Sequence, residues 1–241
     1  MTGYRIRVLQ SIVGLSLVMT VIPHGIAAPL EDVRIGVILT TVKEDHSFMF
    51  GPSIISEEKS KEYLSGLAHD LLFSKELPPA WPEWKFMQIS AVYCHAGPEG
   101  ADAFLSITRE PKKIAKCDTL EKLLEKCNCV VLVNTGGKGE ANFELVSKCL
   151  EAGHPIFVDK FLAATASQAH QLIELAQQKE VPLMSASFLL FSEPGLQVKS
   201  KIDDRGLTKV TSTGWDGTNI AGDIHPISHM LMMTGERKPV S

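Results

Sequence analysis

An acid and a base stand side by side where an apolar run of the chain ends, in the stretch HPIFVDKFLA at positions 154–163. Residues 156–158 have the character of a buried strand, and Asp159 and Lys160 follow them directly. An ammonium group at the mouth of a crevice can donate hydrogen bonds to a bound hydroxyl or carboxylate. The alternative is a solvated charge at a strand end, paired with Asp159.

Histidines are the second group of candidates for chemistry. His225 and His229 lie four residues apart, so a helix would place them on one face, as in a pair of metal ligands. Neither a carboxylate nor a third ligand accompanies them, and we therefore predict no metal site. An ordinary histidine at the start of a helix is the alternative for His225, and a loop histidine without a role is the alternative for His46.

The elements that would position these residues follow from hydrophobic periodicity. Apolar runs of strand length alternate with segments of helical periodicity, which predicts a parallel sheet covered by helices, an α/β fold. Near-continuous apolar strands are typical of a sheet that is buried on both faces. The predicted strands are Val33–Thr40, Phe86–Cys94, Cys129–Asn134, Ile156–Lys160 and Leu183–Ser187.

Three helices are predicted between the later strands. Asp118 and Glu121 form a capping box at the start of the first. The second ends at Gly153 and Pro155. The face of the second helix is Ala141, Leu145, Cys149 and Ala152, and the face of the third is Ala166, Ala169, Leu172, Ile173 and Ala176.

Small or polar residues follow every predicted strand. In an open parallel sheet, ligands bind outside the carboxyl ends of the strands, where successive loops diverge. We therefore expect these residues to line one crevice. They are Thr40, Thr41, His95, Asn134, Thr135, Gly136, Gly137, Asp159, Lys160, Ser185 and Ser187.

The stretch CVVLVNTGGKGEANFELVSKCLEAGHPIFVDKFLAATASQAHQLIELAQQKEVPLMSASFLLFS resembles the middle of the glucose-fructose oxidoreductase and inositol dehydrogenase family, Gfo/Idh/MocA. The resemblance extends over roughly residues 33–235 and is strongest over 129–191. It implies a Rossmann-type, doubly wound parallel sheet that binds NAD or NADP, followed by a second α/β domain. The family's Glu-Lys-Pro motif falls on residues 159–161, and its substrate-side histidine falls on His225.

This resemblance also implies an activity and a set of roles. Hydride would pass between a sugar or polyol carbon and the nicotinamide ring, the chemistry being the cofactor's own. His225 would act as general base, and Lys160 would hold the reacting hydroxyl and the developing oxyanion. Residues implied to line the cofactor site are Thr40, His46, His95, Asn134, Thr135, Gly136 and Asp159.

Several positions depart from the family pattern. The first predicted strand is followed by TTVKEDHSFMFGPSI instead of a G-x-G-x-x-G turn, and residues 45–47 resemble the Ser-His variant found in some branches. His95 replaces the acidic ribose ligand, and Phe161 replaces the motif proline. A non-catalytic Rossmann-fold binding protein, or an inactive fragment of a longer enzyme, is therefore the alternative function.

Composition limits the class of partner. The 241 residues are 44% hydrophobic and 22% charged, values typical of a globular protein, and the net charge is -4. The sequence lacks the basic stripe of a nucleic-acid-binding protein, so we expect a small-molecule substrate and no nucleic acid. Association into a homo-oligomer stays open. The five cysteines show no disulfide spacing and are expected in the core.

The N-terminal segment has the layout of a secretory signal. Arg5 and Arg7 precede the apolar run 12–22, and small residues up to position 28 follow. We expect cleavage after Ala27 and export, with a retained membrane anchor as the alternative. The expected domains are residues 1–28 as signal or anchor, 29–191 as Rossmann domain and 192–241 as the start of a second domain.

Overall fold

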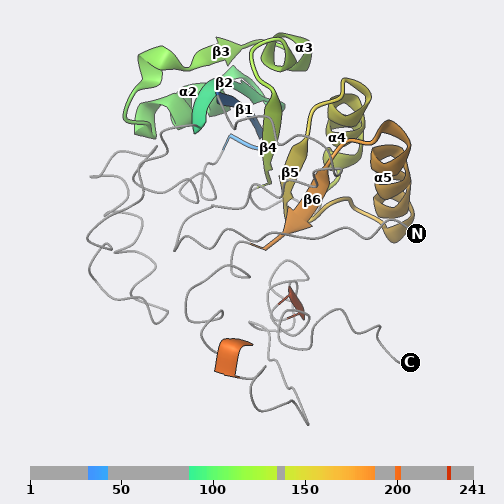
Figure 1. The fold of residues 1–241 in the computed structure, drawn as a ribbon. Coiled ribbons are helices and arrows are strands. Elements are labelled where there is room, and N and C mark those ends of the chain that lie inside the picture. Colours follow the sequence, from blue (N-terminus) through green and yellow to red (C-terminus); the bar gives the residue numbers. More distant parts are fainter. Residues whose placement is uncertain (1–31, 43–86, 135–138, 188–198, 202–226, 229–241) are drawn as a thin grey trace.

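A computed structural model of the chain describes residues 32–42, 87–134, 139–187, 199–201 and 227–228. These residues form a six-stranded sheet in the order β3-β2-β1-β4-β5-β6, in which every pairing is parallel (Figure 1). From β1 the chain winds outward to β3 on one side, and it then returns to β4 and winds outward to β6 on the other. This strand order is that of the doubly wound Rossmann fold. The predicted α/β class is therefore confirmed.

The strands agree closely with the predicted ones. Each of the five predicted strands is present, and its carboxyl end lies within one residue of the prediction. The strand missed by the sequence analysis is β3, whose three residues pair only with β2 at the sheet edge. The strands are β1 Val33–Leu39, β2 Met87–Cys94, β3 Ala115–Cys117, β4 Cys129–Val133, β5 Ile156–Asp159 and β6 Leu183–Ala186.

Helices cover both faces of this sheet. Helices α4 and α5 lie side by side over β5 and β6, and α2 lies with β2 and β3 at the other end of the sheet (Figure 1). The sequence analysis missed α2, whose first turn holds Pro98 and Gly100, residues that usually indicate a turn. The helices are α2 Pro98–Ile107, α3 Leu120–Leu124, α4 Asn142–Glu151 and α5 Ala166–Lys179, with a 3-10 turn at Pro111–Lys113.

Alternation along the central strands divides the core into two layers. In β1, Ile38 joins the layer under α3, α4 and α5, whereas Val37 and Leu39 join the layer under α2. Side chains of a strand point to opposite faces in turn, so one apolar strand can serve both layers. In β4, Leu132 packs in the first layer and Val133 in the second. Strands β1 and β4 are therefore fixed from both sides.

Two details of the predicted helices were wrong. The residue that caps α3 is Thr119, whose hydroxyl accepts from the Lys122 amide, whereas Asp118 pairs with the Lys122 ammonium at 3.0 Å. A threonine hydroxyl reaches the third helical amide from the position directly before the helix. In α5, Ile173 is 43% exposed, because the buried stripe runs through Leu172 and Ala176.

The cysteines are placed as expected. All five are free, four are buried and Cys129 is half-buried. Burial raises the pKa of Cys127 to about 11 and that of Cys149 to about 12, so both stay protonated at neutral pH. The expected second domain, the loop before β2 and the leader lie outside the described residues, apart from short pieces at 199–201 and 227–228.

Gly36 allows α3 and the turn after it to approach β1 closely. A Cβ atom at this position would lie 2.7 Å from Cys127 Sγ and 2.7 Å from Leu123 Cδ2. Both neighbours are buried in the same layer of the core, so neither can move freely.

We expect Gly36→Ala to lower the free energy of unfolding by about 1–3 kcal/mol, because it overfills this layer. Denaturant unfolding measures the change. The double variant Gly36→Ala/Cys127→Ala should cost less than the sum of the two single variants, since removal of the sulfur makes room for the methyl group. Additive costs would contradict this packing.

Candidate functional site

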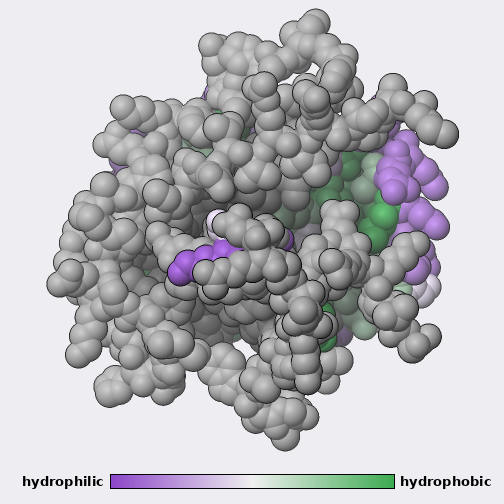
Figure 2. Space-filling model, turned by 60° about the horizontal axis from the view of Figure 1, so that its bottom comes forward, coloured by the Kyte–Doolittle hydropathy of each residue, from purple (hydrophilic) through white to green (hydrophobic). Residues whose placement is uncertain are grey.

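The carboxyl ends of β1 and β4 meet where the winding of the sheet reverses. From this point the chain runs toward β2 and β3 on one side and toward β5 and β6 on the other. Crevices at such a reversal are the usual ligand sites of open parallel sheets. Figure 2 brings forward the end of the molecule toward which β5 and β6 point. Both hydrophilic and hydrophobic residues of the described part are visible in this view.

Asn134 joins the strand ends at this reversal. Its side-chain carbonyl accepts a hydrogen bond from the Thr40 hydroxyl at 3.0 Å, and its amide donates to the Lys160 carbonyl at 3.4 Å. The Thr40 backbone amide also donates to the Val133 carbonyl at 3.2 Å. With 1% of its surface exposed, Asn134 ties the ends of β1, β4 and β5 together inside the protein.

Lys160 is buried at the end of β5. It is 7% exposed and follows Asp159, which is 0% exposed. Burial lowers the pKa of Lys160, and the neighbouring Asp159 opposes that shift. The interpretation of Lys160 as a solvated strand-end charge is therefore wrong.

A second buried asparagine bonds to the backbone of the residue after Lys160. Asn142, at the start of α4 and 0% exposed, donates from its side chain to the carbonyl of Phe161. The peptide bond between Lys160 and Phe161 is cis. The sequence analysis missed Asn142, since an asparagine in the first turn of a helix has no distinctive pattern.

The end of β2 contributes exposed polar groups. The His95 backbone amide donates to the Leu39 carbonyl at 2.8 Å, which places His95 beside the end of β1, and its side chain is exposed. A Cβ atom on Gly97 would lie 2.6 Å from Glu99 Oε2, so this carboxylate turns back over the start of α2. The sequence analysis missed Glu99. Its place in the first turn of the helix after β2 is the signal that could have found it.

The structure thus brings together part of the predicted set. Thr40, Asn134, Asp159 and Lys160 meet at one edge of the sheet, and Ser187, 1% exposed, follows β6 at the same edge. Roles in cofactor binding stay predictions for all of them. The remaining candidates lie outside the described residues: His46, Thr135, Gly136 and His225.

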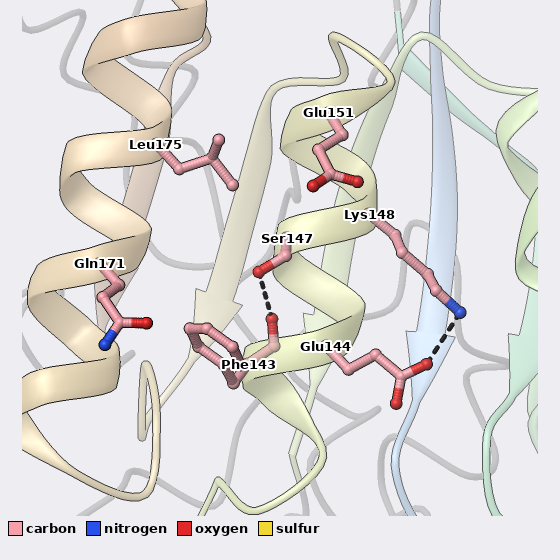
Figure 3. A pocket seen from close by; sticks show the side chains of 7 residues that line it. All are labelled: Phe143, Glu144, Ser147, Lys148, Glu151, Gln171 and Leu175. Carbon is pink, nitrogen blue, oxygen red and sulfur yellow. Dashed lines mark hydrogen bonds and ion pairs between the residues drawn. The ribbon is translucent and has the colours of Figure 1, made fainter.

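A separate hollow of about 530 Å³ lies between α4 and α5 (Figure 3). It contains none of the predicted residues. Three of its polar side chains bond within α4: Glu144 pairs with Lys148 at 2.8 Å, and Ser147 donates to the Phe143 carbonyl at 2.7 Å. Exposed pairs of this kind contribute little to stability. The predicted site residues that the structure describes lie instead at the strand ends.

Two other classes of site are missing from the described part of the chain. There, His, Cys, Asp and Glu residues form no group of three or more that could hold a metal ion. Within the same residues, no helix has the length and apolar character to cross a membrane.

Comparison with known proteins agrees with the fold. Residues 72–187 match the family model GFO_IDH_MocA, described as an oxidoreductase family with an NAD-binding Rossmann fold. This part of the chain belongs to the Gfo/Idh/MocA family. A search of curated proteins found no match.

Solved structures of low sequence identity share the fold. GenD2 from gentamicin A biosynthesis, solved with NAD, gives a TM-score of 0.56 at 16% identity over 89% of this chain and 57% of its own. The probable oxidoreductase yhhX gives 0.52 at 16% identity over 83% and 53%. A putative oxidoreductase from Bacteroides fragilis gives 0.53 at 15% identity over 84% and 52%. The chain thus spans about half the length of these proteins.

The burial of Lys160 has a consequence for stability. Since its pKa is lowered in the folded chain, the unfolded chain binds this proton more readily. Stability is therefore lost as the pH falls from the ordinary lysine value of 10.5 toward the folded pKa, and the loss is complete below it.

Lys160→Met removes the titrating group and keeps the apolar stem. We expect its melting temperature to exceed that of the parent chain at pH 7, with a gap that closes as the pH rises through 10.5. Thermal unfolding between pH 7 and pH 11 checks this. A melting temperature below that of the parent at pH 7, with a gap that narrows toward pH 11, would show instead that the charged lysine stabilises the fold.

Proposed function

We propose that this chain binds NAD or NADP and takes part in hydride transfer between the nicotinamide ring and a CH–OH carbon of a sugar or polyol. The observation that carries the proposal is the buried ammonium of Lys160 at the carboxyl edge of a Rossmann sheet, beside the reversal between β1 and β4. Family membership over residues 72–187 supports it. The nicotinamide, when bound, supplies the acceptor or donor of the hydride.

The described residues have the donors and acceptors that a dinucleotide needs. His95 and Glu99 are exposed after β2, where a Rossmann fold holds the adenosine ribose, so an imidazole and a carboxylate can bind its hydroxyl groups. Thr40 lies at the end of β1, next to the path of the pyrophosphate. This set fits NAD better than NADP, because a carboxylate repels a 2′-phosphate.

Lys160 has the properties of a group that stabilises developing negative charge. Its ammonium is largely removed from water, and hydrogen bonds from a desolvated cation to an oxyanion are stronger than those of a solvated one. In the oxidation direction, the reacting hydroxyl loses its proton while its carbon loses hydride. We propose that Lys160 donates to that oxygen and that His225 accepts the proton.

Cofactor binding and turnover test this function. Binding of NAD or NADP should raise the melting temperature of the wild-type chain. A panel of sugars and polyols, followed by NADH or NADPH absorbance, identifies a substrate. Lys160→Ala should then lower kcat by about 100-fold or more, because it removes transition-state stabilisation.

The control for this variant is Lys122→Ala, which removes an exposed lysine of α3 paired with Asp118 and should leave kcat unchanged. Full turnover in Lys160→Ala would contradict the proposed role of Lys160. A wild-type chain whose melting temperature is unmoved by NAD and by NADP would favour a non-catalytic Rossmann-fold protein.

We also propose that the chain is exported, on the basis of its N-terminal charge and apolar pattern. Expression of the full chain in a secreting cell, followed by N-terminal sequencing, tests this. Protein that begins at Ala28 outside the cytosol is the expected result. Unprocessed protein in the cytosol would contradict it.

A further inference from the structure

Two asparagines hold the backbone that carries Lys160. Asn134 donates to the Lys160 carbonyl, and Asn142 donates to the Phe161 carbonyl. The two asparagines come from different elements, since Asn134 follows β4 and Asn142 begins α4. They donate to consecutive carbonyls, so two side-chain hydrogen bonds hold the backbone directly after the Cα atom of Lys160.

These carbonyls lie beyond the reach of the sheet. The last residue of β5 paired to β4 is Val158, and the last paired to β6 is Asp159. Lys160 and Phe161 therefore continue past the ladder, where a buried carbonyl needs a donor other than a neighbouring strand. The two side-chain amides supply donors at that point.

Asparagine is suited to holding the backbone beside the Lys160 ammonium. A neutral amide donates a hydrogen bond without adding charge, whereas an acid or a base at the same place would change the electrostatics of Lys160. Thr40 in turn donates to the Asn134 carbonyl at 3.0 Å, which fixes the amide so that its N–H groups face β5. The direction of the amide is thus set by β1.

We propose that Asn134 and Asn142 are positioning residues that set the direction in which the Lys160 side chain leaves β5. The proposal rests on the role given to Lys160 above. It assigns Asn134 an internal task, since its side chain is 1% exposed and occupied by Thr40 and Lys160, and not a direct contact with the dinucleotide.

The chain contains a matched control at the other end of the same strand. Asn128 directly precedes β4, as Asn134 directly follows it. The Asn128 amide donates to the Asp32 carbonyl at 3.0 Å, and its side-chain carbonyl accepts from the Arg34 amide at 2.8 Å. It therefore makes the same kind of bonds between β4 and β1 at the edge remote from Lys160.

The test compares Asn134→Ala, Asn142→Ala and Asn128→Ala in the full chain. Acetylation of Lys160 by acetic anhydride at pH 8 is followed by mass spectrometry, with free phenylalanine as internal standard. We expect Lys160 to react about threefold faster or more in the first two variants, because local opening exposes the amine, and at the parent rate in Asn128→Ala.

Unchanged Lys160 reactivity in a folded Asn134→Ala protein would overturn the proposal. If Asn134→Ala does not fold, Thr40→Val serves instead, because it replaces the hydroxyl that donates to the Asn134 side chain with a methyl group of similar size. Failure of the proposed function gives a different result: the wild-type chain then binds neither NAD nor NADP, while the acetylation rates still report on Lys160.

Discussion

The amide of Asn134 is the point on which the geometry of the site depends. Parallel pairing brings the ends of β1, β4 and β5 to one edge of the sheet, but pairing alone does not fix what lies beyond the last ladder bond. Asn134 crosses that edge, taking one hydrogen bond from Thr40 and giving another to the Lys160 carbonyl. A buried polar group of this kind is costly unless it is satisfied, so its bonds hold the three strand ends in one arrangement.

Burial of Lys160 and Asp159 at this edge works against stability. A buried ammonium and a buried carboxylate both lose hydration, and their attraction to each other repays only part of that loss. A fold that needed only to be stable would place apolar side chains at the end of β5. The role proposed for Lys160 would account for the cost, because a lysine with a lowered pKa can interact with a developing oxyanion more strongly than a solvated one.

Much of this architecture could be predicted from the sequence. The strands β1, β2, β4, β5 and β6 are continuous apolar runs that end in small or polar residues, and that pattern gave their carboxyl ends to within one residue. The edge strand β3 could not be found, because three residues, one of them the exposed Lys116, carry no periodic signal. Burial of Lys160 was also beyond the sequence. It depends on residues distant in the chain, such as Asn134, which lies 26 positions earlier and bonds to the Lys160 carbonyl. The same holds for Asn142, whose partner is 19 residues away.

Hydrogen–deuterium exchange of the full chain with and without NAD measures the central claim most directly. A dinucleotide in the crevice should slow exchange in peptides that contain the carboxyl ends of β1, β4 and β5 and the start of α4. Peptides from their amino ends, near Asn128, should exchange at the same rate in both samples. Protection confined to the hollow between α4 and α5, or no protection at saturating NAD, would contradict the account of a cofactor crevice built around Asn134 and Lys160.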